Sequence, residues 1–139
     1  HDPASPVPVD NLARIFLMQG KPDEALLLTE RATALATSSP PATVADLSLA
    51  AKTHETRGQA LLALNRPQEA EQAFAQSLQL DPQYLDAARA LGLMRADRAD
   101  WAGAAALLER VVAARPGDAQ AREILNVCRQ RVSVGGGLP

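Results

Sequence analysis

Residues 65–70, NRPQEA, decide how the chain divides into helices, because they end one apolar helical pattern and begin the next. A similar stretch, GKPDEA, occupies residues 20–25. Three residues around the first stretch recur at a spacing of 34 positions: Gly58, Ala70 and Pro82 return as Gly92, Ala104 and Pro116. A fixed period of this length indicates one supersecondary unit stacked several times, because such a unit cannot bury its apolar face alone.

The composition favours closely packed helices. Hydrophobic residues make up 47% of the 139 residues, but only 3% are aromatic. Alanine and leucine form helices well, whereas strands favour β-branched and aromatic residues. The net charge of −2 gives no indication of a nucleic-acid partner. No apolar run reaches the roughly 18 residues of a membrane span, so we expect no membrane insertion.

Proline and glycine mark the boundaries of seven expected helices. Three prolines predict an extended or disordered segment over residues 1–8, and three consecutive glycines predict a flexible tail over residues 134–139. We expect one helical repeat domain between them, at residues 9–133. Its expected parts are repeats at about 6–39, 51–84 and 85–118, a helical extension at 42–50 before the second repeat, and a final helix at 118–132.

The repeats resemble the tetratricopeptide repeat family, whose pattern places small and large residues at fixed positions and ends on proline. The second repeat matches it with Gly58, Leu61, Ala70, Phe74 and Pro82, and the third with Gly92, Ala104, Leu108 and Pro116. The first repeat lacks the terminal proline. The small residues let helix axes approach, and the large ones fill the gaps beside them. The resemblance implies an all-α, right-handed superhelix (an α-solenoid) of three antiparallel helix pairs and a C-terminal capping helix.

The extension at residues 42–50 departs from the family pattern. Its apolar residues Val44, Leu47 and Leu49 must pack against something. One interpretation is that they cover the second helix of the first repeat. The other is that the long helix 43–65 contacts another subunit and forms a homo-oligomer.

The sequence contains no recognisable catalytic constellation. A metal or catalytic role for His54 needs partner residues, and the other histidine, His1, lies in the expected disordered end. We interpret His54 as a core residue, Cys128 as a small apolar residue of the capping helix, and Trp101 as packing at a turn. We therefore expect no enzyme activity, no metal and no cofactor.

The resemblance also implies a binding groove on the concave face, lined by the first helix of each pair. Ten groove positions transfer to this chain: Arg14, Leu17, Met18, Lys52, Glu55, Gln59, Leu62, Arg89, Leu93 and Val127. Family members that bind chaperone C-termini use a clamp of lysine, arginine and asparagine. That clamp is not reproduced, because Asp10, Arg14 and Asp86 occupy its asparagine and lysine positions. The groove therefore favours an apolar helix or extended peptide over an acidic C-terminal tail.

The sequence predicts a non-catalytic protein–protein interaction module, an adaptor or assembly scaffold that binds a peptide or helix in this groove. Two alternatives stay open. The Pro-rich and Gly-rich ends look like linkers, which indicates an accessory domain of a larger bacterial enzyme or of a secretion or envelope component. The third hypothesis is a self-assembling scaffold. The excess of arginine over lysine suggests a bacterial source, but it does not distinguish cytoplasm from periplasm.

Overall fold

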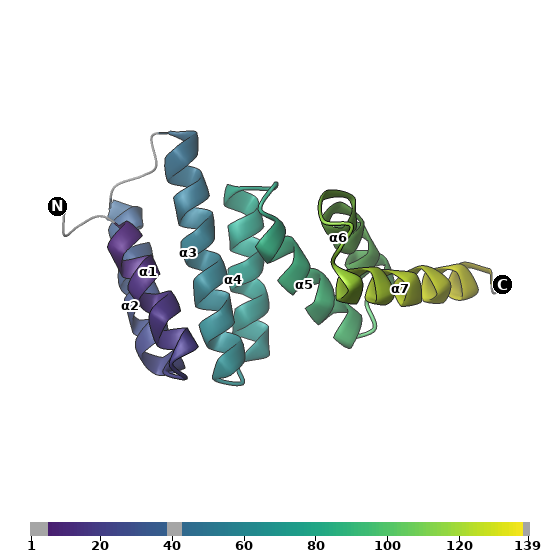
Figure 1. Cartoon of the computed structure of the whole chain (residues 1–139), viewed down its shortest axis with the longest axis horizontal. Coiled ribbons are helices and arrows are strands. Elements are labelled where there is room, and N and C mark those ends of the chain that lie inside the picture. The colour runs from purple at the N-terminus through teal and green to yellow at the C-terminus, as the bar shows by residue number, and fades with distance from the viewer. Residues whose placement is uncertain (1–5, 39–42, 138–139) are drawn as a thin grey trace. The chain divides into compact units, whose positions relative to one another are not determined.

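The computed structural model describes residues 6–38 and 43–137, and all regular structure in these ranges is helical. The prediction of an all-α fold is confirmed. In chain order the helices are α1 (Pro6–Met18), α2 (Pro22–Ser38), α3 (Val44–Ala63), α4 (Pro67–Leu80), α5 (Leu85–Asp97), α6 (Trp101–Ala114) and α7 (Ala119–Gly137) (Figure 1). None of these helices combines the length and the apolar character needed to cross a membrane.

The turns between helices follow from residues with special backbone properties. Gly20 has a φ of 75° and Asn65 a φ of 59°, and glycine and asparagine tolerate this left-handed region better than other residues. Pro22 and Pro67 each open the following helix, where a missing N–H is not needed and a fixed φ is already helical. The Pro and Gly pattern therefore predicted these boundaries well.

Both ends of the helical region differ from the expectation. α1 begins at Pro6 instead of after Pro8, because the N–H groups of a first turn have no intrahelical partner and prolines fit there. α7 continues to Gly137 instead of ending near residue 132, since glycine weakens a helix by about 1 kcal/mol per residue without forbidding it. The rest of the expected N-terminal segment and tail, at residues 1–5 and 138–139, lies outside the described residues, as do residues 39–42.

The helices form two compact units, residues 1–84 and residues 85–139. In the first unit α3 packs against α1, α2 and α4, and α1 also packs against α2. Figure 1 shows α3 between the α1–α2 pair and α4. In the second unit α6 packs against both α5 and α7, and α5 also contacts α7.

Small and large residues interlock inside both units as the repeat pattern predicted. In the first unit Phe74 and Leu61 are fully buried, and a Cβ atom added to Gly58 would lie 2.6 Å from Cε1 of Phe74. In the second unit Leu108 is fully buried and packs over Gly92, with 3.0 Å between an added Cβ and Cδ2. Glycine at these two positions therefore permits the close approach of paired helices.

The extension at the start of α3 packs partly within its own unit. Thr43 and Asp46 form a capping box at its N-terminus, and Ser48 Oγ donates a hydrogen bond to Asp81 Oδ2 at 3.5 Å. Leu47 is half-buried, whereas Val44 is exposed. The extension is thus held by its cap and by the end of α4, and its first turn stays at the surface.

Candidate functional site

Five polar side chains of the first unit form a connected group that we call the Arg14 cluster: Asp10, Arg14, Lys52, Glu55 and Tyr84. Arg14 Nε donates to Asp10 Oδ2 at 3.3 Å, and its Nη2 donates to Glu55 Oε1 at 3.0 Å and to Tyr84 Oη at 3.4 Å. Tyr84 Oη donates to the same Glu55 oxygen at 3.4 Å. Lys52 Nζ lies 4.0 Å from Asp10 Oδ2. The cluster therefore connects α1, α3 and the turn that follows α4.

The acids and bases of the cluster lie at different depths. The side chains of Asp10 and Glu55 are 1% and 6% exposed, whereas those of Arg14 and Lys52 are 37% and 41% exposed. Burying an ionised carboxylate is costly unless a charged donor compensates it, and here Arg14 compensates both. The formal charges cancel, but the groups within reach of a partner are mainly the cations.

The two buried carboxylates hold Arg14 in its charged form. Burial by itself lowers the pKa of Arg14, but the charges of Glu55 and Asp10 outweigh burial, so the pKa lies above its ordinary value. The hydrogen bond from Arg14 to Asp10 acts in the same direction. Arg14 is thus a fixed cation with a defined orientation, which is how arginine recognises carboxylates most effectively.

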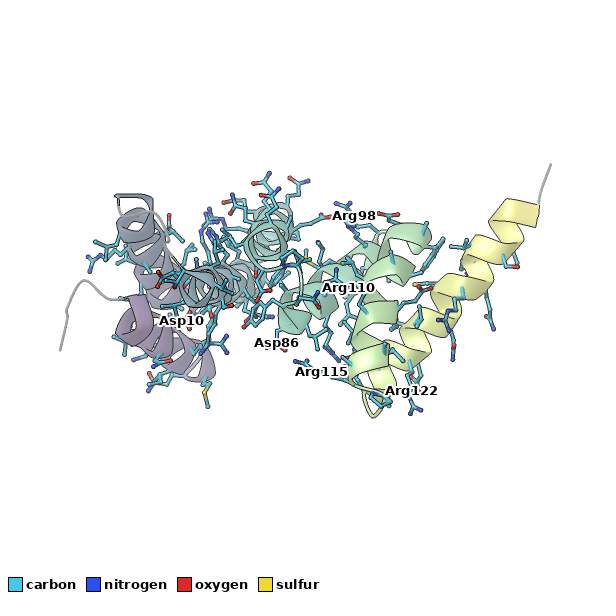
Figure 2. The ribbon with its side chains drawn as sticks, turned by 90° about the horizontal axis from the view of Figure 1, so that it is seen from above. Asp10, Asp86, Arg98, Arg110, Arg115 and Arg122 are labelled. Atoms are coloured by element: carbon cyan, nitrogen blue, oxygen red, sulfur yellow. The ribbon has the colours of Figure 1, made fainter. Side chains whose placement is uncertain are left out.

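Helical periodicity explains why these residues meet. Asp10 and Arg14 are one turn apart on α1, and Lys52 and Glu55 are one turn apart on α3. Asp10 pairs with Lys52, and Arg14 pairs with Glu55. Because the earlier residue of each helix contacts the earlier residue of the other, α1 and α3 run in the same direction. Asp10 lies on the side of α1 that faces α3 (Figure 2).

The same register predicts a mainly apolar region one to two turns beyond the cluster. The next residues on these stripes are Leu17 and Met18 on α1, and Gln59 and Leu62 on α3. Met18, Gln59 and Leu62 are exposed, and Leu17 is half-buried. We call the cluster together with this region the α1–α3 face.

The second unit uses its groove positions differently. Arg89 Nε donates to Asp118 Oδ2 at 2.6 Å, and its Nη2 donates to Gln120 Oε1 at 2.6 Å. Asp118 also accepts the N–H of Ala121 at 3.1 Å and so caps α7. The hydrogen bond from Arg89 and then that from Ala121 lower the pKa of Asp118. Arg89 therefore attaches α5 to the start of α7.

The predicted groove residues thus fall into separate groups. Seven belong to the α1–α3 face: Arg14, Leu17, Met18, Lys52, Glu55, Gln59 and Leu62. Three belong to the second unit, where Arg89 is engaged with α7, Leu93 is half-buried and Val127 is exposed. Glu55 is buried beneath Arg14 and is not itself a surface contact.

Sequence reasoning missed Tyr84, which completes the cluster. The available signal was weak: Tyr84 is the only tyrosine of the chain and directly follows a proline turn. Its role depends on a contact with Arg14 that spans 70 residues, which no local pattern encodes.

The remaining reactive side chains hold structural positions. His54 is half-buried, and burial, followed by the charge of Arg57, lowers its pKa. Burial raises the pKa of the Cys128 thiol, which lies fully buried on α7. Arg131 lies over the half-buried Trp101 ring, 5.6 Å from its centroid. Among the residues that the structure describes, no three His, Cys, Asp or Glu side chains group to hold a metal ion.

Comparison with known proteins identifies the repeat. Residues 51–84 match the family model described as tetratricopeptide repeat. No curated protein sequence matches the chain.

Solved structures share the fold at low sequence identity. A crystal structure of MamA protein has a TM-score of 0.73 and 20% identity, over 95% of this chain and 66% of that one. The first TPR of Spaghetti (RPAP3) bound to the HSP90 peptide SRMEEVD has a TM-score of 0.74 and 20% identity, over 96% of this chain and 99% of that one. The second TPR domain of the human RPAP3 protein, in complex with the HSP70 peptide SGPTIEEVD, has a TM-score of 0.67 and 23% identity. This match covers 87% of this chain and 92% of that one. At these identities the likeness shows the fold.

Proposed function

We propose that this chain, which carries a tetratricopeptide repeat at residues 51–84 and has the fold of tetratricopeptide repeat domains, is a non-catalytic protein-interaction module. In this proposal it acts as an adaptor or assembly scaffold, and the α1–α3 face binds a peptide or helix of the partner. The repeat and the likeness to peptide-bound structures support the general role. The site itself rests on the geometry of the Arg14 cluster.

One observation carries the choice of site: the cations of the cluster are accessible, and the carboxylates that orient them are buried. A carboxylate of a partner can therefore approach Lys52 and the outer edge of Arg14 without contacting Asp10 or Glu55, because both of these acids are buried. Because Arg14 is already held by two buried acceptors, little side-chain entropy is lost when a ligand binds.

The apolar region beside the cluster defines the rest of the proposed ligand. Met18 and Leu62 offer exposed apolar surface along the two helices, so we propose a segment with an acidic residue next to apolar ones. This ligand adds an acidic residue to the apolar helix or extended peptide that the sequence favoured, because burial removes Asp10 and Glu55 from the surface. Two similar structures hold peptides with acidic residues beside an apolar one, SRMEEVD and SGPTIEEVD, which supports a ligand of this kind.

Selection of a random displayed peptide library on the purified chain tests the proposal. Dissociation constants of the selected peptides are then measured by calorimetry for the wild type, Lys52→Ala and Leu62→Asp. We expect Lys52→Ala to weaken binding about 5- to 10-fold, the effect of one charge-assisted hydrogen bond. Leu62→Asp should weaken it by more than about 10-fold, because it places a charge in the apolar contact.

Leu27→Asp provides the matched control. Leu27 is more exposed than Leu62 and lies on α2, outside the face, so this variant should bind as the wild type does. Selected peptides that bind all three variants equally would move the binding site away from the α1–α3 face.

A further inference from the structure

A second surface of the first unit combines apolar residues with one charge of each sign. On α2, Glu24, Leu28, Arg31 and Leu35 recur at i, i+4, i+7 and i+11, so they form one stripe along the helix. Leu12 and Ile15 add two apolar residues from α1. We call these six residues the N-terminal edge. Leu12, Ile15 and Leu35 are 42%, 48% and 40% exposed, so the edge presents three large aliphatic side chains to solvent.

Helical geometry turns this edge away from α3. On α1, Asp10 and Arg14 face α3, and Leu12 and Ile15 lie about 160° and 100° around the helix from Arg14. On α2, the charges of Asp23 and Glu30 reach Arg66 at the end of the α3–α4 turn. The Glu24 stripe lies about 120° around α2 from that pair. The edge is therefore on the opposite side of the unit from the α3–α4 pair.

The two charges on the edge, Glu24 and Arg31, are unpaired among the residues that the structure describes. Glu24 and Arg31 are both exposed, and neither forms an ion pair with any residue that the structure describes. Glu24 lies four residues before Leu28 and Arg31 three residues after it. Because a negative and a positive side chain lie at similar distances on either side of Leu28, two antiparallel copies of this surface are complementary to each other.

We propose that a second copy of this chain covers the N-terminal edge, with α2 antiparallel to the partner copy's α2 and a two-fold axis beside Leu28. The symmetry then places Glu24 of each copy opposite Arg31 of the other, which forms two equivalent ion pairs around a Leu28 contact. Leu12, Ile15 and Leu35 extend the apolar contact on both sides. A parallel arrangement would place like charges opposite one another, so the opposite signs of Glu24 and Arg31 favour the antiparallel direction.

This dimer leaves the α1–α3 face open, because Arg14 lies on a different side of α1 from Leu12 and Ile15. The interface also does not involve the long helix α3. It goes beyond the proposed function, since peptide binding and self-association occupy separate surfaces and each can fail alone.

Sedimentation equilibrium of the purified chain, from micromolar to millimolar concentration, tests the pairing. The wild type should dimerise, and Glu24→Arg and Arg31→Glu should each weaken the dimer at least about 10-fold by placing like charges opposite one another. The double variant Glu24→Arg with Arg31→Glu should restore the dissociation constant to within about 3-fold of the wild type, because the ion pairs re-form with exchanged signs.

Two aspartate substitutions separate this edge from any other interface. Leu35→Asp should abolish the dimer, whereas Leu27→Asp should leave it unchanged, because Leu27 is 53% exposed but lies on the Asp23–Glu30 side of α2. Circular dichroism confirms that each variant is folded. A wild type that is monomeric throughout, a charge exchange that does not restore association, or equal effects of the two leucine variants would overturn the proposal.

Discussion

Gly58 and Gly92 hold equivalent positions in successive repeats, yet their neighbours leave different amounts of room. An added Cβ would meet the rigid ring of Phe74 at 2.6 Å in the first case and Leu108 at 3.0 Å in the second. Contacts under 3.0 Å require a neighbour to move, and a fully buried aromatic ring has little freedom to do so.

We therefore expect Gly58→Ala to destabilise the protein and Gly92→Ala to be close to neutral. Overpacking a core costs about 1–3 kcal/mol, and replacing a helical glycine by alanine returns up to about 1 kcal/mol. Chemical denaturation of the two variants beside the wild type measures the difference in the free energy of unfolding. Equal destabilisation by both would show that the Phe74 ring shifts without cost.

We expect His54 to make the free energy of unfolding depend on pH. Its folded-state pKa is lowered, first by burial and then by the charge of Arg57, and its Nδ1 is buried without a hydrogen-bond partner in the described part of the chain. Below its ordinary pKa of about 6.5 the unfolded chain gains a proton that the folded chain resists. The stabilising contribution is therefore present at neutral pH and is lost as the pH falls through the folded pKa.

His54→Leu removes this titration. We expect the free energy of unfolding of the variant, relative to the wild type, to increase as the pH is lowered from about 7 to 5. Urea denaturation at several pH values measures this difference, and groups common to both proteins cancel. A difference that does not change with pH would mean that folding leaves the pKa of His54 unperturbed.

At the scale of the element, α7 depends on Asp118 for its start and for its attachment to α5. The carboxylate accepts the N–H of Ala121 and pairs with Arg89, while Ala121, Leu125 and Cys128 bury the inner face of the helix. The cap and the ion pair share one side chain, so a single change removes both.

Asp118→Ala should destabilise the second unit by about 1–2 kcal/mol, the usual cost of removing an N-cap. Asp118→Asn should cost less, because the amide oxygen keeps the cap and only the charge is lost. In a protein that already carries Asp118→Ala, Arg89→Ala should cause little further loss of stability, because its ion-pair partner is absent. A double-mutant cycle should therefore give a favourable coupling energy between the two side chains. Additive effects in that cycle would mean that the ion pair is too exposed to contribute.

Element boundaries were predictable where proline or glycine imposes a backbone conformation. The turns at Gly20 and Asn65 and the helix starts at Pro22 and Pro67 lie where the sequence placed them. The outer ends were wrong, because prolines in a first turn and glycines in a last turn are compatible with a helix. Residue type alone therefore does not show whether a terminal proline or glycine lies inside the helix or outside it.

At the scale of the whole molecule, the 34-residue period predicted stacked helices but not how the stack divides. The described helices form two compact units, and the chain passes from one to the other between residues 84 and 85. The repeat pattern of the sequence continues across this point without a change. The α1–α3 face and the N-terminal edge both belong to the first unit. Binding and self-association are therefore proposed for the same half of the chain.

The sequence by itself determined the all-α repeat fold, the small–large interlocking of paired helices and most helix boundaries. These depend on local backbone preferences and on a period that repeats along the chain. Only the tertiary structure decided which groove charges are accessible. The contacts of Arg14 with Glu55 and Tyr84 span 41 and 70 residues, and they bury the acids beneath the cations. Burial is a property of three-dimensional packing, so two side chains of similar sequence context, Lys52 and Glu55, end as an exposed cation and a buried anion.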